Sequence, residues 1–157
     1  MKKIFSILLF VMITFSFCSC AKVENYEFLH NSDEIKEIEL VMVTENPIEE
    51  IGDEIVVFET ATLAKITDID MFLADFSTLT CIRMKLAPAV GILAGYNAIK
   101  LTYSNGDIEF IGALGQVYLI DGVYIAGESN LCFSDDDLNR LIAAYVAHES
   151  KQTNLDF

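Results

Sequence analysis

The stretch AIKLTYSNGDIEFIG, residues 98–112, carries the strongest structural signal in the chain. Ile99, Leu101 and Tyr103 alternate with polar residues, which is the pattern of a strand with one buried face. The pair Asn105-Gly106 follows directly and favours a type I′ turn, the tightest connection between two antiparallel strands. The stretch therefore predicts a β-hairpin.

The alternation beyond the turn also predicts how the two strands pair. Ile108 and Phe110 are expected to resume the buried face on the second strand. A two-residue loop places Tyr103 opposite Ile108 and Thr102 opposite Glu109. In this register Glu109 lies on the polar face of the hairpin.

Further strands are expected on both sides of this hairpin. Asp121-Gly122 joins two short runs that are apolar on both faces, which indicates a central or covered strand pair. Upstream, Asn46-Pro47 is expected to end one strand and to separate it from the next. The extended segments that the pattern predicts are residues 34–46, 54–66, 80–86, 116–120 and 123–127.

Two helices are expected from a shared local pattern. Thr67 is followed by Asp70, and Ser134 by Asp137, each with an apolar residue just before and just after the pair. A hydroxyl at the start of a helix can accept from an open backbone N–H, and acids there favour the positive end of the helix dipole. Apolar residues at helical spacing follow both starts.

These elements predict one α+β domain over residues 33–150, with a C-terminal tail at 151–157. We expect a mostly antiparallel sheet of five to seven strands with two helices packed on it. The full chain has 157 residues, which fits a single core of ordinary size.

The N-terminus has the architecture of a signal peptide. Residues 1–3 include two lysines, and residues 4–17 are free of charge and mostly apolar. Positive flanks stay in the cytoplasm, so the acidic remainder is expected outside the cell.

The end of this apolar run, Phe17-Cys18-Ser19-Cys20, resembles the lipobox of bacterial lipoproteins. The resemblance implies that residues 1–19 are a leader and that Cys20 becomes the acylated first residue. Residues 20–32 would then be a lipidated N-terminus and polar tether. The lipid would anchor the domain at the outer face of the cell membrane.

Other interpretations of the two cysteines stay open. A Cys-x-Cys pair can be a metal or redox site, although here it lies in an apolar leader. The leader could also belong to an ordinary secreted protein, or stay uncleaved as an anchor.

Two features of the domain have alternative interpretations. Cys81 and Cys132 could form a disulfide or stay as two separate buried thiols. The apolar segment at residues 87–96 fits neither period: it is either a buried connector or an exposed loop for a partner. In the second case Val90, Ile92, Leu93 and Tyr96 would carry the interaction.

Net charge and sequence motifs narrow the range of functions that this chain could have. The formal net charge of −14 becomes −16 without Lys2 and Lys3, which argues against nucleic acid as a partner. The sequence shows no nucleophile elbow, phosphate loop or zinc-helix motif, and neither aspartate cluster has the spacing of a calcium loop. We expect a non-catalytic domain without cofactor or metal that binds a protein or an envelope component. The alternative is an accessory or inhibitor-like module acting on an extracellular enzyme.

Overall fold

The computed structural model describes residues 22–51, 55–83, 96–113, 115–127 and 131–153. Over these residues the chain has the predicted α+β class with antiparallel pairing, and its strands form two sheets where the sequence predicted one. The six-stranded sheet has the order β3-β2-β5-β6-β7-β8, and the three-stranded sheet has the order β1-β4-β9. The strands are β1 Lys22–Glu24, β2 Ile35–Ile51, β3 Ile55–Lys65, β4 Cys81–Arg83, β5 Asn97–Tyr103, β6 Ile108–Gly112, β7 Gly115–Ile120, β8 Val123–Ala126 and β9 Leu131–Phe133.

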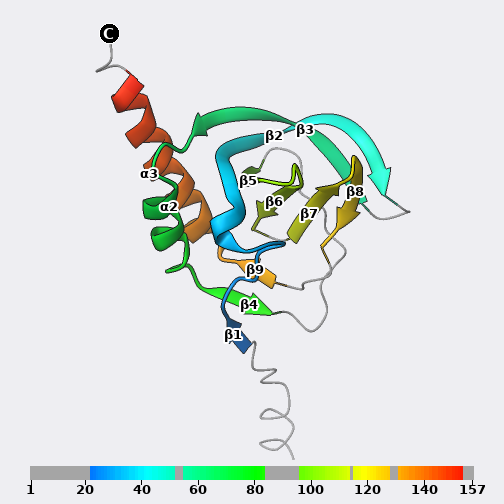
Figure 1. Cartoon of the computed structure of the whole chain (residues 1–157), viewed down its shortest axis with the longest axis horizontal. Helices are drawn as coiled ribbons and strands as arrows, with labels where there is room; N and C mark the ends of the chain where they lie inside the picture. Colours follow the sequence, from blue (N-terminus) through cyan, green and yellow to red (C-terminus); the bar gives the residue numbers. More distant parts are fainter. Residues whose placement is uncertain (1–21, 52–54, 84–95, 114, 128–130, 154–157) are drawn as a thin grey trace, which may run out of the picture.

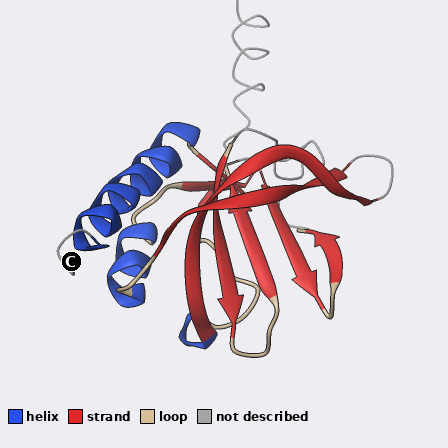
Figure 2. Cartoon of the chain, turned by 90° about the horizontal axis from the view of Figure 1, so that it is seen from above, coloured by secondary structure: helices blue, strands red, loops and turns tan. Residues whose placement is uncertain are grey.

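The helices lie together at one side of the larger sheet (Figures 1 and 2). The two α-helices are α2 Ile69–Phe76 and α3 Asp135–Thr153, and the short 3-10 helix η1 spans Ser32–Glu34. We call the sheet face that packs with α2 and α3 the helix face. The main core lies there and joins buried residues of the strands and helices, among them Ile38, Leu40, Ile99, Leu101, Phe72, Phe76, Leu138 and Ile142.

The β2–β3 ribbon is longer than the sequence predicts. Strand β2 has 17 residues and continues through Pro47 instead of ending before it. Shifts in the pairing with β3 occur on both sides of Pro47. Because a proline removes one ladder hydrogen bond, it is tolerated at such an irregularity, and the ribbon bends there without stopping.

The β5–β6 hairpin forms where expected, but its register is one residue away from the prediction. Thr102 pairs with Ile108 and Leu101 pairs with Glu109. The backbone N–H of Gly106 donates to the Tyr103 carbonyl, and that of Tyr103 donates to the Asp107 carbonyl. The loop therefore holds one residue more than a two-residue turn allows.

The cause lies in the backbone of the turn. A type I′ turn needs positive φ at both central residues, whereas only Gly106, at φ 96°, has it here. The hairpin thus combines an ordinary turn with a glycine bulge. At the β7–β8 turn Asp121 and Gly122 have φ values of 51° and 80°, so the type I′ geometry occurs there instead.

This shift reverses the faces of β6. Glu109 and Ile111 now lie on the helix face, opposite Leu101 and Ile99, while Phe110 lies on the opposite face. A slip of one residue exchanges every side chain between the two faces of a strand. The structure thus corrects the expected polar position of Glu109: it is fully buried.

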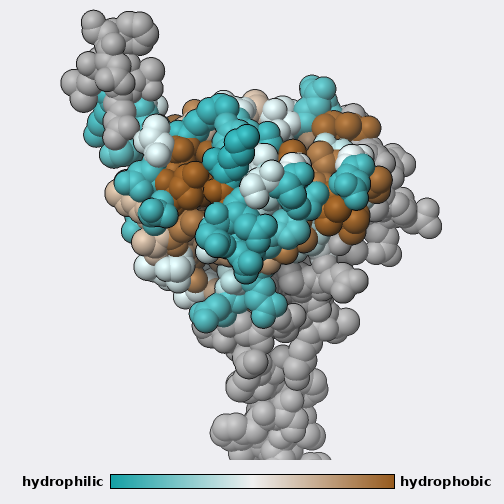
Figure 3. All heavy atoms as spheres, in the orientation of Figure 1, coloured by the Kyte–Doolittle hydropathy of each residue, from teal (hydrophilic) through white to brown (hydrophobic). Residues whose placement is uncertain are grey.

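The β7–β8 hairpin is not the central pair that its apolar faces suggest. Strand β8 is the last strand in the sheet order. Val123 is 57% exposed and Ile125 is 43% exposed. Figure 3 shows apolar surface at the right of the molecule, where β8 and the far end of the β2–β3 ribbon lie in Figure 1.

Both helix starts have hydrogen-bonded caps. At α2 the cap is Asp68, one residue after the predicted Thr67, and its carboxylate accepts from the Met71 N–H at 2.9 Å. At α3 the Ser134 hydroxyl oxygen accepts from the Asp137 N–H at 3.4 Å, as predicted.

Gly106→Ala tests the backbone explanation of the hairpin register. An added Cβ would meet no atom within 4 Å, so the cost is purely conformational. We expect the free energy of unfolding to fall by about 1 kcal/mol, measured by urea denaturation. Gly106→Asn should cost less, because asparagine tolerates positive φ. Equal losses in both variants, or a similar loss in the matched turn variant Ser104→Ala, would contradict this explanation.

Candidate functional site

The most unusual group in the fold is the carboxylate of Glu109. Its side chain is fully buried in the helix face. It accepts hydrogen bonds from the Tyr26 hydroxyl at 2.6 Å and from the backbone N–H of Leu29 at 3.1 Å. The Tyr103 hydroxyl donates a third, short bond. The three hydrogen bonds that this buried acid accepts thus all come from neutral donors.

Two opposing effects act on the ionisation of this acid. Burial is the larger and raises the pKa of Glu109, while the hydrogen bonds from Tyr103, Tyr26 and Leu29 lower it in part. Burial, together with the nearby Glu109 carboxylate, also raises the pKa of Tyr26 and of Tyr103. Both tyrosines therefore remain hydroxyl donors throughout the physiological range.

A second polar contact lies next to Glu109 at the β5–β6 turn. His30 Nε2 is 2.7 Å from Asp107 Oδ2, and the Asn105 side-chain amide donates to the same carboxylate oxygen at 2.7 Å. The bond with His30 lowers the pKa of Asp107. The His30 ring also packs edge-on against Tyr103, with ring centroids 4.8 Å apart.

Aromatic packing completes the site. Tyr26 lies 5.4 Å from Phe76 of α2 and 5.4 Å from Phe133 of β9, measured between ring centroids. Phe28 lies 5.0 Å from Tyr26 and 5.7 Å from Phe76. We call residues 25–30 the strap, because they cross from β1 to η1 and contact the sheet, α2 and β9.

The strap corrects the prediction of a polar tether over residues 20–32. In the structure residues 22–24 form β1, and Tyr26, Phe28 and Leu29 pack against the main core. Their apolar side chains follow neither a helical nor a strand period, so sequence periodicity did not reveal them. Tyr26 and Leu29 donate hydrogen bonds to Glu109, which lies about eighty positions further along the sequence.

The opposite face of the sheet carries a separate polar network. Glu39 accepts from Lys100 Nζ at 2.6 Å and from the Thr62 hydroxyl at 3.1 Å. Burial is the largest single effect on Glu39 and opposes its ionisation, but the hydrogen bond and charge of Lys100, together with Thr62 and Lys65, outweigh it and lower the pKa. Lys65 contacts both Glu37 and Glu39. The network joins β2, β3 and β5, which gives it a structural role.

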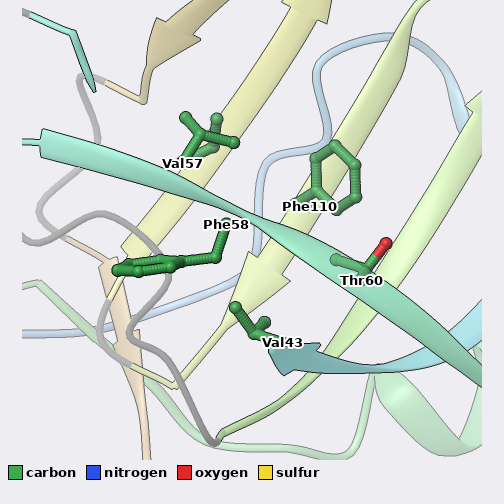
Figure 4. Close-up of a pocket in the computed structure, with 6 residues that line it drawn as sticks. Val43, Val57, Phe58, Thr60 and Phe110 are labelled. Atoms are coloured by element: carbon green, nitrogen blue, oxygen red, sulfur yellow. The ribbon is translucent and has the colours of Figure 1, made fainter. Parts of the chain in front are cut away.

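Two hollows lie in the described part of the chain. Beneath β3, apolar side chains including Val43, Phe58 and Phe110 enclose about 10 Å³ (Figure 4). That space holds at most one water molecule. An open groove of about 420 Å³ lies between α2 and α3, and its lining mixes the charged residues Asp75, Asp137 and Arg140 with threonines and apolar side chains. Asp75 there already accepts from the Tyr145 hydroxyl at 2.7 Å.

Most residues of the predicted interaction loop fall outside the described part of the chain. This holds for Val90, Ile92 and Leu93, and also for the predicted lipidation residue Cys20. Tyr96 is described and is 45% exposed. Its carbonyl accepts from the Val43 N–H at 2.9 Å, so its backbone extends the pairing of β5 with β2.

Cys81 and Cys132 are buried thiols on neighbouring strands, and they are not joined to each other. Cys81 pairs with Phe133, and Cys132 pairs with Ile82. Directly opposed residues share a face and successive residues alternate, so the two thiols leave opposite faces of the small sheet. This geometry explains why adjacent strands hold two cysteines without a disulfide.

The polar contacts of the two histidines do not form a nucleophile-and-base pair. His30 bonds with Asp107 and Asn105, and His148 Nδ1 lies 3.8 Å from Glu149. Among the described residues, no group of three or more His, Cys, Asp or Glu side chains could hold a metal ion. Nor does any helix in those ranges have the length and apolarity to cross a membrane.

Comparison with known proteins found no matching family model, no matching curated protein and no matching solved structure.

Tyr26→Phe tests whether the strap is held by its hydrogen bond to Glu109. The change removes one hydroxyl donor to a buried acid and leaves the aromatic ring. We expect a loss of about 1–3 kcal/mol in the free energy of unfolding, measured by urea denaturation. Tyr124→Phe is the matched control, because Tyr124 lies on β8 away from the strap. Equal small effects of the two changes would show that the Tyr26 bond contributes nothing.

The raised pKa of Glu109 makes a second prediction, about pH. The folded state holds the proton of Glu109 more tightly than the unfolded state. Its contribution to stability is therefore complete below the unfolded pKa of about 4.3, and it is lost as the pH rises through the folded pKa. The other titratable groups around the site, Tyr26, Tyr103, His30 and Asp107, are common to wild type and Glu109→Gln.

We therefore expect the stability of wild type relative to Glu109→Gln to fall between pH 4 and pH 8. Urea denaturation at several pH values measures it. A constant difference, or one that grows with pH, would contradict the assignment.

Proposed function

We propose that this protein is a bacterial lipoprotein with a non-catalytic binding domain, anchored by acylated Cys20 at the outer face of the cell membrane. The observation that carries the proposal is the sequence Phe17-Cys18-Ser19-Cys20 at the end of a charge-free apolar run. In such a protein the leader directs export, and the acyl chains hold the domain on the bilayer.

The position of the first strand supports an anchor at Cys20. Strand β1 begins at Lys22, and the strap that follows is built into the core through Tyr26 and Leu29. A lipid on Cys20 would thus hold the folded domain directly, with one residue between the anchor and the first strand.

One observation supports a binding role. Strand β8 exposes Val123 and Ile125 next to each other along one edge of the sheet. Exposed apolar residues at a sheet edge are a common feature of surfaces that meet a protein partner. We infer a protein or an envelope component as the partner class.

Replacement of the two leader cysteines one at a time tests the anchor. We expect metabolic labelling with a fatty acid to mark the wild type and Cys18→Ala, because only Cys20 becomes the first residue after cleavage. Cys20→Ala should carry no label and should be released from membranes by washing. Equal labelling of Cys18→Ala and Cys20→Ala, or no label on the wild type, would contradict the proposed anchor.

A further inference from the structure

We propose that the groove between α2 and α3 binds a basic side chain of a protein partner, with its cationic head at Asp75 and its methylene stem on Leu79, Leu141 and Ala144. This inference rests on the proposed binding function and names the chemistry of the partner. It does not depend on the anchor at Cys20.

The first step is the mixed lining of the groove. Asp75 comes from α2, Leu79 from the residues that follow this helix, and Leu141 and Ala144 from α3. A carboxylate and apolar side chains thus line one space of about 420 Å³. Lysine and arginine side chains have the matching structure, because each carries a charged group on an apolar stem.

The second step is how Asp75 is held. Its Oδ2 accepts from the Tyr145 hydroxyl of α3 at 2.7 Å. Burial, together with the Asp75 carboxylate, raises the pKa of Tyr145 to about 12, so this hydroxyl remains a donor at neutral pH. A carboxylate has about four sites that accept hydrogen bonds, so Tyr145 orients Asp75 and leaves it able to bind a cation.

The third step is the role of the one arginine in the lining. Arg140 Nη1 lies 3.3 Å from Asp137 Oδ1, three positions earlier on α3. This ion pair offsets the charge of Asp137 and leaves Asp75 as the other carboxylate of the groove. A cation held at Asp75 therefore meets Arg140 only as a like charge, which gives Arg140 a distinct place in the test.

The charges along the two helices favour a cation. Residues 68–80, which include α2, hold three acids and no base. Beyond that range the next base is Arg83, at the last position of β4. Helix α3 holds four acids against Arg140, Lys151 and His148. This excess of acids attracts a basic segment to the groove.

Two further acids near the groove already have structural roles. Asp68 and Glu149 both act on Tyr145 through their charge, which places them near the Asp75 end of the groove. Asp68 caps α2, and Glu149 lies 3.8 Å from His148 Nδ1. Asp75 is thus the carboxylate that the groove presents to a partner.

The experiment titrates the full chain, held in micelles of a neutral detergent, with a short peptide of alternating arginine and alanine that is blocked at both ends. The salt concentration is about 0.15 M, at which exposed charges more than about 8 Å apart are largely screened. The NMR shifts of the backbone amides measure binding. We expect the amides of residues 75–80 and 137–144 to move.

A second peptide, with citrulline in place of each arginine, keeps the shape of the side chain and removes its charge. We expect its dissociation constant to be about five-fold higher, since an exposed charge pair contributes up to about that factor. Equal affinity for the two peptides, or no binding of the arginine peptide by the wild type, overturns the site.

Three variants locate the contact. Asp75→Asn should weaken binding about five-fold, while its amide oxygen still accepts from Tyr145. The charge-matched control is Asp121→Asn at the β7–β8 turn, which lies on the other side of the molecule from the helices (Figure 1) and should keep the wild-type affinity. Arg140→Gln should tighten binding, because it removes a like charge.

Equal losses in Asp75→Asn and Asp121→Asn overturn the site. Weaker binding by Arg140→Gln also overturns it, because the groove would then hold an anionic group. The citrulline peptide and Arg140→Gln keep the test decisive even if Asp75→Asn fails to fold.

The outcomes also separate this inference from the proposed function. Failure of the groove changes neither the fatty-acid label expected at Cys20 nor the exposed edge of β8. A chain that binds the arginine peptide but carries no label overturns the anchor and leaves the groove.

Discussion

One buried carboxylate determines how the beginning of this chain joins the rest. Glu109 accepts from two tyrosine hydroxyls and one backbone N–H, and two of these three donors belong to the strap. A buried acid that lost these donors would leave an uncompensated polar group in the core. The aromatic contacts of Tyr26 and Phe28 add apolar burial to the same attachment, so the strap is held both by polarity and by packing.

The position of this acid depends in turn on a single glycine. Positive φ at Gly106 alone, and not at Asn105, adds one residue to the hairpin loop. That extra residue moves Glu109 from the polar face to the helix face, where the donors of the strap meet it. The local geometry of a turn thus decides which side chain enters the core.

Sequence patterns predicted the class of this fold well and its polar interior poorly. The β5–β6 hairpin, the Asp121-Gly122 turn and the cap at Ser134 follow from local chemistry, since the residues that form each feature are neighbours in sequence. The predicted register of β5 and β6 was wrong because Asn-Gly is compatible with two turn types whose loops differ in length by one residue. The packing of the strap was missed for another reason. Its aromatic residues follow neither a helical nor a strand spacing, and Glu109, which binds it, was predicted on the polar face of the hairpin. The opposite orientation of Cys81 and Cys132 likewise depends on the β4–β9 register, which spacing along the chain does not contain.

The strap also has a consequence for the order of folding. Its contacts with Glu109 and Asp107 join residues separated by 83, 80 and 77 positions. A chain that leaves the ribosome from its N-terminus exposes the strap first, but it has no docking site until β6 and its turn have also been made. Contacts between such distant residues also slow the search for the native state. The domain therefore cannot complete its core until β6 has been made. The strap comes near the start of the sequence, but it is among the last segments to pack.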